Sequence, residues 1–146
     1  MSTYTKLHAL RGADAGLAPV EDADLGTLPR WNLADLYAGP EDAAIDTDLD
    51  WAEEQAKALA ADAKGAMAGM TPAKLAKTIA WFESIHERLG KLGTYAFLNG
   101  ATQRTDGEAM QFQAKINERS TNISSELVFF SLEVNRIEDA KLDDAR

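Results

Sequence analysis

The residues of this chain that come closest to a catalytic motif are His86 and Glu87. In the zinc motif His-Glu-x-x-His, two histidines one helical turn apart bind the same metal. Here Gly90 stands where the second histidine is required, and the other histidine, His8, lies near the N-terminus. The chain has no cysteine. Because one imidazole cannot hold a catalytic zinc ion, we predict that His86 is a half-exposed helix residue and that the chain has no metal site.

Three alternating aspartates resemble the start of a calcium-binding loop: Asp46, Asp48 and Asp50. Such a loop also needs glycine at its sixth position and glutamate at its twelfth, where this chain has Trp51 and Lys57. The surrounding residues, 41–64, include eight acids and two lysines, a net charge of −6. We therefore expect a solvated acidic helix face with Asp48 at the surface.

A set of aromatic residues invites comparison with a binding cleft, but several recur at helical spacing and so predict core packing. The set is Trp81, Phe82, Tyr95, Phe97, Phe112, Phe129 and Phe130. Three bulky residues beside the apolar stripes, Trp51, Trp81 and Phe129, are our candidates for facing a partner. The sequence has no serine with a histidine base nearby and no glycine-rich phosphate loop. We predict no catalytic, metal-binding or cofactor-binding residue in this chain.

The composition is typical of one folded domain. Of the 146 residues, 45% are hydrophobic and 27% are charged, close to the average for globular proteins. An excess of 24 acidic over 15 basic residues gives a net charge of −9, which repels nucleic-acid phosphates and anionic lipids. There is no apolar run long enough to span a membrane and no apolar core of a secretory signal. The sequence predicts a cytoplasmic protein whose partners include neither nucleic acid nor membrane.

Glycine, proline and capping residues indicate where helices begin and end in the first half of the chain. Residues 1–28 lack a sustained helical or strand period and predict a flexible tail. Asn32 is expected to cap a short turn that closes at Gly39. Pro40 suits the first position of a helix that ends at Gly65 and Gly69. The apolar stripe of this helix is Ile45, Leu49, Ala52, Ala56, Leu59, Ala63 and Met67.

Two further helices follow. The pair Thr71 and Pro72 begins the second one, and Asn99 marks its expected stop. Its stripe is Leu75, Ile79, Phe82, Ile85, Leu89, Leu92 and Ala96. Thr105 and Glu108 form a capping box that opens the third helix. Its stripe continues for about seven turns, interrupted by Arg119: Phe112, Ile116, Ile123, Leu127, Phe130, Val134 and Ile137.

The fold class that these patterns predict is all-α, because no strand-like alternation is longer than four residues and the apolar residues recur at helical spacing. Long helices joined by short loops pack antiparallel. We therefore expect antiparallel helices in a bundle-like layer over residues 29–146, preceded by the flexible tail.

Three segments of the chain resemble oligoendopeptidase F, a family of thimet-oligopeptidase-like zinc metallopeptidases. Residues 28–37 read LPRWNLADLY, which is similar to the family's opening LPxWDLxDLY except for Asn32. Residues 90–96 read GKLGTYA and resemble its second-helix segment. Residues 127–137 read LVFFSLEVNRI and resemble its LxFFxLELNR stretch. The resemblance covers the chain from residue 28 to about residue 144, in order and nearly without gaps.

This resemblance implies the helical N-terminal part of a zinc metalloendopeptidase that hydrolyses short peptides, in which these helices form a wall of the substrate channel. Zinc and its ligands lie far downstream in that family, so no catalytic or metal residue is carried over. The chain is then expected to be an inactive fragment whose partner is the missing catalytic domain, with self-association as a further expectation. The alternative is a free-standing helical module that binds another protein without catalysis.

Overall fold

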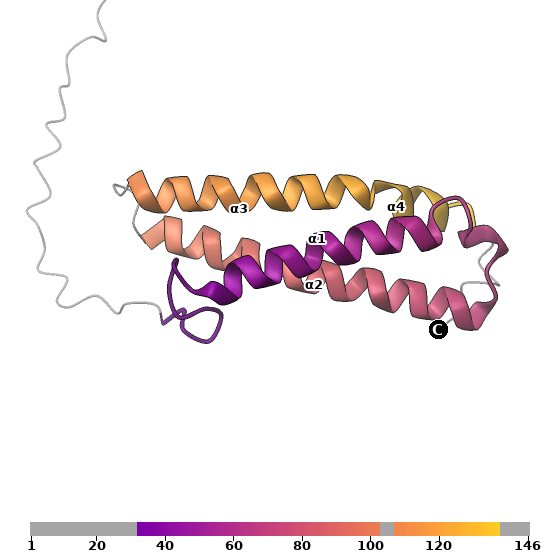
Figure 1. Ribbon diagram of the computed structural model, residues 1–146, viewed down its shortest axis with the longest axis horizontal. Helices are drawn as coiled ribbons and strands as arrows, with labels where there is room; N and C mark the ends of the chain where they lie inside the picture. The colour runs from indigo at the N-terminus through magenta and orange to yellow at the C-terminus, as the bar shows by residue number, and fades with distance from the viewer. Residues whose placement is uncertain (1–31, 103–106, 138–146) are drawn as a thin grey trace, which may run out of the picture. The chain divides into compact units, whose positions relative to one another are not determined.

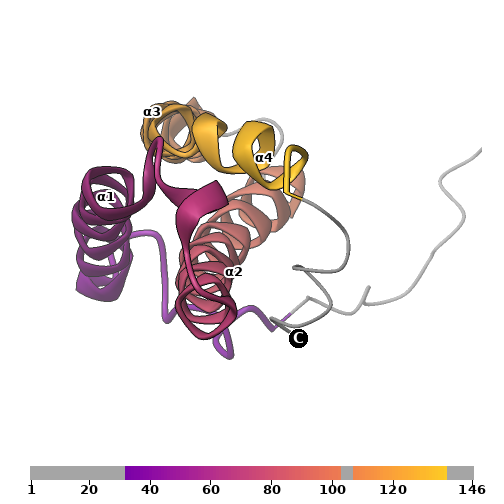
Figure 2. The ribbon, with the colours of Figure 1, turned by 90° about the vertical axis from the view of Figure 1, so that its right-hand side faces the viewer.

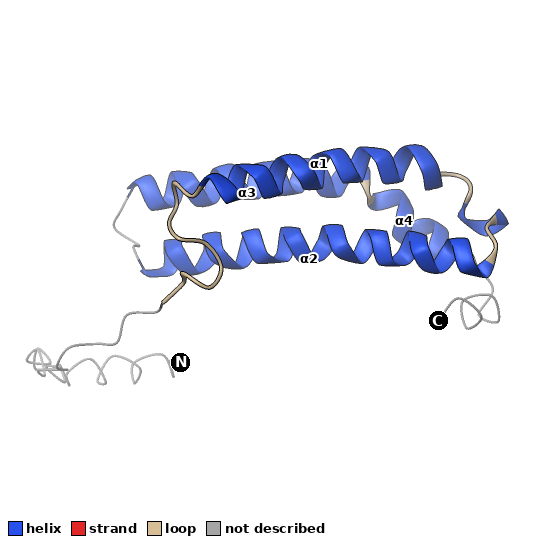
Figure 3. Ribbon diagram, turned by 60° about the horizontal axis from the view of Figure 1, so that its bottom comes forward, coloured by secondary structure: helices blue, strands red, loops and turns tan. Residues whose placement is uncertain are grey.

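The computed structural model describes residues 32–102 and 107–137, which form helices and connecting turns without a strand (Figures 1 and 3). The predicted tail at 1–28 and the cap Thr105 lie outside these residues. The helical elements of the described part are α1 (Ala43–Ala63), the 3-10 turn η1 (Met67–Gly69), α2 (Pro72–Thr102), α3 (Gly107–Glu126) and α4 (Val128–Val134). The all-α prediction is confirmed.

The first helix begins three residues later than the sequence predicts. Asp42 is its N-cap, and its carboxylate accepts hydrogen bonds from the backbone N–H groups of Ala44 and Ala38, each at 2.9 Å. These bonds hold the pKa of the Asp42 carboxyl below its usual range. Because the carboxylate satisfies donors on both sides of the cap, Pro40 lies in the preceding turn and α1 starts at Ala43.

The second helix starts as predicted and runs slightly further. Thr71 Oγ1 accepts a hydrogen bond from the backbone N–H of Lys74 at 3.3 Å, which makes Thr71 the capping residue before Pro72. The helix continues through Asn99 to Thr102. Asn99 is buried, so it lies within the packed part of α2 instead of at its end.

The predicted third helix is two helices, because the chain breaks at Leu127. Leu127 has φ −98° and ψ −3°, and the backbone N–H of Phe130 donates to its carbonyl with the tight i→i+3 spacing. Just before the break, the hydroxyl of Ser125 donates back to the carbonyl of Thr121, an arrangement that bends helices. The break reorients α4, so Phe129 and Phe130 are both buried. Phe129 was expected beside the stripe, and that prediction is wrong.

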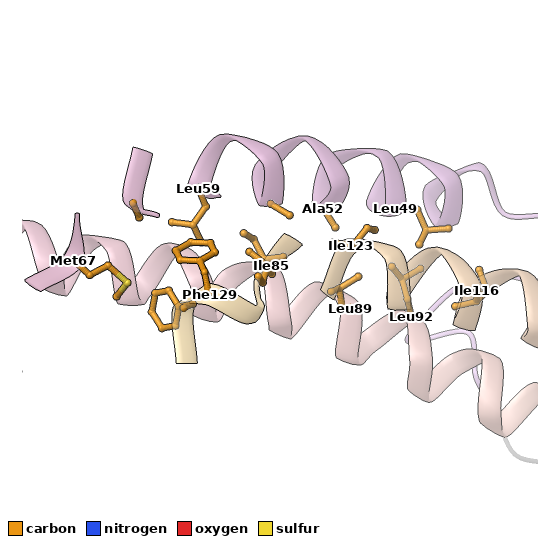
Figure 4. Close-up of a cluster of buried hydrophobic side chains, with 14 of the residues drawn as sticks. Leu49, Ala52, Leu59, Met67, Ile85, Leu89, Leu92, Ile116, Ile123 and Phe129 are labelled. Carbon is orange, nitrogen blue, oxygen red and sulfur yellow. The ribbon is translucent and has the colours of Figure 1, made fainter. Parts of the chain in front are cut away.

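The three long helices pack pairwise and share one core. Consecutive helices run antiparallel, so α1 and α3 are parallel (Figure 1), and the end-on view shows α1, α2 and α3 at the corners of a triangle (Figure 2). Every residue of the predicted α1 stripe is buried. Side chains from all three helices point toward one another along the shared core, and Phe129 from α4 joins it near Met67 and Leu59 (Figure 4).

Candidate functional site

Asp48 is the centre of a buried polar cluster between α1, α2 and the turn that precedes α1. Asp48 is only 8% exposed. One carboxylate oxygen is paired with the guanidinium of Arg88. The other accepts a hydrogen bond from the Tyr37 hydroxyl at 2.7 Å, and the Lys91 ammonium lies 3.8 Å from that same oxygen. The prediction that Asp48 is a surface residue is therefore wrong.

Aromatic rings lie beside the two cations of this cluster, which remain partly exposed. The Arg88 guanidinium carbon lies 4.6 Å from the centre of the Trp51 ring, and the Lys91 ammonium lies 4.0 Å from the centre of the Tyr37 ring. Both distances are typical of cation–π contacts. Tyr37 also packs edge-on against Tyr95, with 5.2 Å between ring centres. Burial raises the pKa of Tyr37, and the hydrogen bond to Asp48 raises that pKa further.

The Asp48–Arg88 pair is the first step of a regular polar ladder between α1 and α2. Seven residues further along α1, Gln55 Oε1 accepts a hydrogen bond from the indole N–H of Trp81 at 2.9 Å. Another seven residues along, Asp62 is paired with Lys74 at 3.1 Å. Each step advances seven residues on α1 and returns seven residues on α2. Two helices that pack antiparallel in a coiled-coil register produce this spacing, so the ladder fixes the register of α1 against α2.

A set of ion pairs, here called the α1–α3 seam, joins α1 to the parallel helix α3. Lys115 is paired with Asp46 at 3.1 Å, and Arg119 is paired with Asp50 at 2.8 Å and with Glu53 at 3.0 Å. The two basic residues are one turn apart on α3, as Asp46 and Asp50 are on α1. The hydrogen bonds to Asp50 and Glu53 raise the pKa of Arg119. Arg119, which interrupts the predicted apolar stripe of α3, thus lies at the α1–α3 interface.

The prediction of a solvated acidic face on α1 is wrong at Asp48, whereas Asp46 and Asp50 are exposed as predicted. Carboxylates on one side of its apolar stripe pair with bases of α2, and those on the other side pair with bases of α3. They do so as partners in the fold, and they have no catalytic arrangement. The Asp48 carboxylate faces three donors, and the raised pKa of Tyr37 opposes formation of a phenolate nucleophile.

A carboxylate also fastens α4 to the connection after α1. Glu133 accepts hydrogen bonds from the backbone N–H groups of Gly65 at 2.6 Å and of Met67 at 3.3 Å. Gly65 has a φ of +79°, a conformation that glycine adopts without steric cost. The residue therefore reverses the chain after α1, while Glu133 satisfies donors that the turn leaves unpaired. Glu133 of the LVFFSLEVNRI segment thus joins α4 to the turn after α1 at one end of the bundle (Figure 1).

The predicted aromatic set divides between core and surface. Phe130 stacks on Phe82 with 3.8 Å between ring centres, which confirms core packing for this pair. Trp81 is partly buried against the core, and its indole N–H donates to Gln55. Phe97 is 61% exposed, so its assignment to the core is wrong. Other large hydrophobic side chains that are more than half exposed are Met110, Val128 and Leu132.

A groove of about 620 Å³ lies between the first turns of α1 and α3. Its lining combines acids with the apolar side chains of Ile45 and Phe112. Two of those acids already have partners in the fold, because Asp42 caps α1 and Asp46 is paired with Lys115. The groove is thus a by-product of the α1–α3 seam.

His86 is an exposed residue of α2, and its ring lies 4.2 Å from that of Phe82. Within residues 32–102 and 107–137, no group of three or more histidine, aspartate or glutamate side chains is arranged to hold a metal ion. These side chains therefore do not fit a catalytic zinc ion.

Comparison of the chain with protein-family models, with curated proteins and with solved structures gave no match. Over its described part, the structure contains no helix that is long and apolar enough to cross a membrane.

Proposed function

We propose that this chain is the N-terminal helical part of an oligoendopeptidase F-like zinc metalloendopeptidase that hydrolyses short peptides. In this proposal the helices form a wall of the substrate channel, and the catalytic domain supplies zinc and its ligands. The chain contributes shape and an attachment surface, and it is inactive alone. Its setting is the cytoplasm.

The observation that carries the proposal is that two of the three resembling segments meet in space and that the third packs on the same bundle. Tyr37, from the LPRWNLADLY segment, contacts Lys91 and Tyr95, both from the GKLGTYA segment. The third segment supplies Phe130, which stacks on Phe82, and Glu133, which bonds the turn after α1. The residues on which the resemblance rests thus hold the bundle closed.

Exposed apolar side chains support a binding role beyond this bundle. Phe97, Met110, Val128 and Leu132 are each more than half exposed. Val128 and Leu132 lie one turn apart on α4, and grouped exposed apolar side chains mark interaction sites. A catalytic domain packed on them is one reading. The same observation favours the second candidate function, a free-standing helical module that binds another protein without catalysis.

The coding sequence after codon 146 tests the proposal most directly. Continued coding that contains His-Glu-x-x-His supports the peptidase part, whereas a stop codon after codon 146 favours the free-standing module.

Reconstitution gives a biochemical test. The purified chain is mixed with an oligoendopeptidase F catalytic part that lacks its own helical N-terminal part, and hydrolysis of a quenched-fluorescent short peptide is followed with and without a chelator. We expect the chain alone to bind no stoichiometric zinc and to cleave nothing, and the mixture to cleave more than the catalytic part alone.

Two matched double variants, Phe97→Ser with Met110→Ser and Val128→Ser with Leu132→Ser, report which surface is used without touching the core. Chelator-sensitive cleavage by the chain alone would contradict the proposal, as would a mixture no more active than its parts.

A further inference from the structure

We propose that residues 33–37 form a latch, a segment that opens and closes as a unit on the helix bundle and is attached to it at the Asp48 cluster. The proposal concerns a conformational device and does not depend on the peptidase assignment. In the closed state Tyr37 is inserted between α1 and α2, and in the open state the three helices keep their packing.

The latch is a local structure with its own short-range hydrogen bonds. Leu33 accepts hydrogen bonds at its carbonyl from the backbone N–H groups of Leu36 and Tyr37, at 2.9 and 3.2 Å. Asn32 Oδ1 accepts one from the N–H of Ala34 at 3.1 Å. All of these bonds lie between residues 32 and 37. A single turn that has left the bundle does not keep them, so the amides of Leu36 and Tyr37 exchange with solvent when the segment opens.

Tyr37 makes the directional contacts that fasten the segment to the bundle. Its hydroxyl donates to Asp48, its ring lies under the Lys91 ammonium, and its edge meets Tyr95. Leu33 and Leu36 add partly buried apolar contacts. One side chain therefore carries the polar attachment of the whole turn.

The bundle retains its own attachments when Tyr37 leaves. Asp48 keeps its pair with Arg88, which is the first step of the ladder that continues at Gln55 and Asp62. The α1–α3 seam through Arg119 is also independent of Tyr37. Segments with few attachments at the edge of a well-packed unit open at a lower free energy than the unit itself.

Opening would expose a preformed polar surface beneath Tyr37. The Asp48 carboxylate, the Lys91 ammonium and the Tyr95 ring would lose their cover and remain fixed on α1 and α2.

Native-state amide hydrogen exchange of the full chain at several low urea concentrations tests the latch. The amides of Leu36 and Tyr37 report opening of the latch, and those of Leu49, Leu92 and Ile116 report unfolding of the core. We expect exchange at Leu36 and Tyr37 to depend weakly on urea and exchange at the core amides to depend strongly on it.

Two variants weaken the attachment of Tyr37 to the bundle in different ways, and a substitution elsewhere on α1 is the control. Tyr37→Phe removes the hydroxyl, and Lys91→Met removes the cation over the ring. We expect each to speed exchange at Leu36 and Tyr37 by about tenfold while the core amides stay unchanged. Asp46→Asn, on the same helix but exposed, should change neither group.

Equal urea dependence at the latch and core amides in the unmodified chain would overturn the proposal, because the segment would then unfold only with the bundle. Equal acceleration at both sets in the variants, or no acceleration at Leu36 and Tyr37, would overturn it as well. The measurement on the unmodified chain holds even if a variant fails to fold.

Discussion

The Tyr37 hydroxyl lies 2.7 Å from the carboxylate of Asp48, a residue that the alternating aspartates of the sequence place on a solvated face. The hydrogen bond joins the turn before α1 to α1 itself, and Arg88 brings α2 to the same carboxylate. A single buried charge thus connects three parts of the chain.

Replacement of Asp48 by alanine should lower the free energy of unfolding by about 2 kcal/mol, because a hydrogen bond to a charged group is lost and Arg88 loses its partner. Asp46→Ala removes an exposed carboxylate two residues away and should change the free energy by less than about 0.5 kcal/mol. Urea unfolding followed by circular dichroism measures both values. Equal losses would mean that the Asp48 cluster contributes nothing beyond a surface pair.

Alkaline pH should destabilise the fold through Tyr37. Its pKa is raised in the folded chain, whereas an unfolded tyrosine titrates near about pH 10. Since the unfolded state releases this proton first, stability is complete below that pH and falls as the pH rises above it. The expected loss is about 1.4 kcal/mol at about pH 11.

Tyr37→Phe isolates this effect, because lysines and Tyr95 titrate in both proteins. Urea unfolding at neutral pH and at about pH 11 should show a smaller alkaline loss in the variant by about 1.4 kcal/mol. Identical pH profiles would show that the Tyr37 hydroxyl titrates alike in the folded and unfolded states.

Phe130→Ala should cost about 3 to 5 kcal/mol, because it empties a buried site and removes the ring stacked on Phe82. Leu132→Ala, two residues away and mostly exposed, should cost less than about 0.5 kcal/mol. Thermal and urea unfolding compare the two. A small cost at Phe130 would mean that α4 is not docked on α2.

Glu133→Ala should cost about 1.5 kcal/mol, because the backbone N–H groups of Gly65 and Met67 lose their charged acceptor. Hydrogen exchange should quicken at those two amides more than along α1. Glu118→Ala, on an exposed position of α3, is the matched control and should leave both amides as they are. If the two substitutions behave alike, the bonds between Glu133 and the turn do not stabilise the fold.

The exposed apolar residues should make the purified chain bind a hydrophobic dye or self-associate despite its net charge of −9. Dye fluorescence and sedimentation at moderate salt measure this, with circular dichroism to confirm that the chain stays helical. The double substitution of Val128 and Leu132 by serine should reduce the signal. A helical, dye-silent and strictly monomeric chain would contradict the fragment and favour the free-standing module.

The sequence by itself determined the helices and their apolar faces. Residues spaced by three and four define which side of α1 is buried, since that periodicity follows from helix geometry alone. The cap at Thr71 and the turn at Gly65 act within a few residues, so their residue types predict them. The cap at Asp42, which starts α1 three residues later than predicted, is known only from the structure.

Only the tertiary structure decided what the charges do. The steps at Asp48, Gln55 and Asp62 are seven residues apart, yet that spacing has no meaning until α2 offers Arg88, Trp81 and Lys74 in the opposite direction. The break at Leu127 likewise follows from docking Phe129 and Phe130 together. A helical period shows which residues share a face, but the free energy of burying a carboxylate depends on partners that come from other helices.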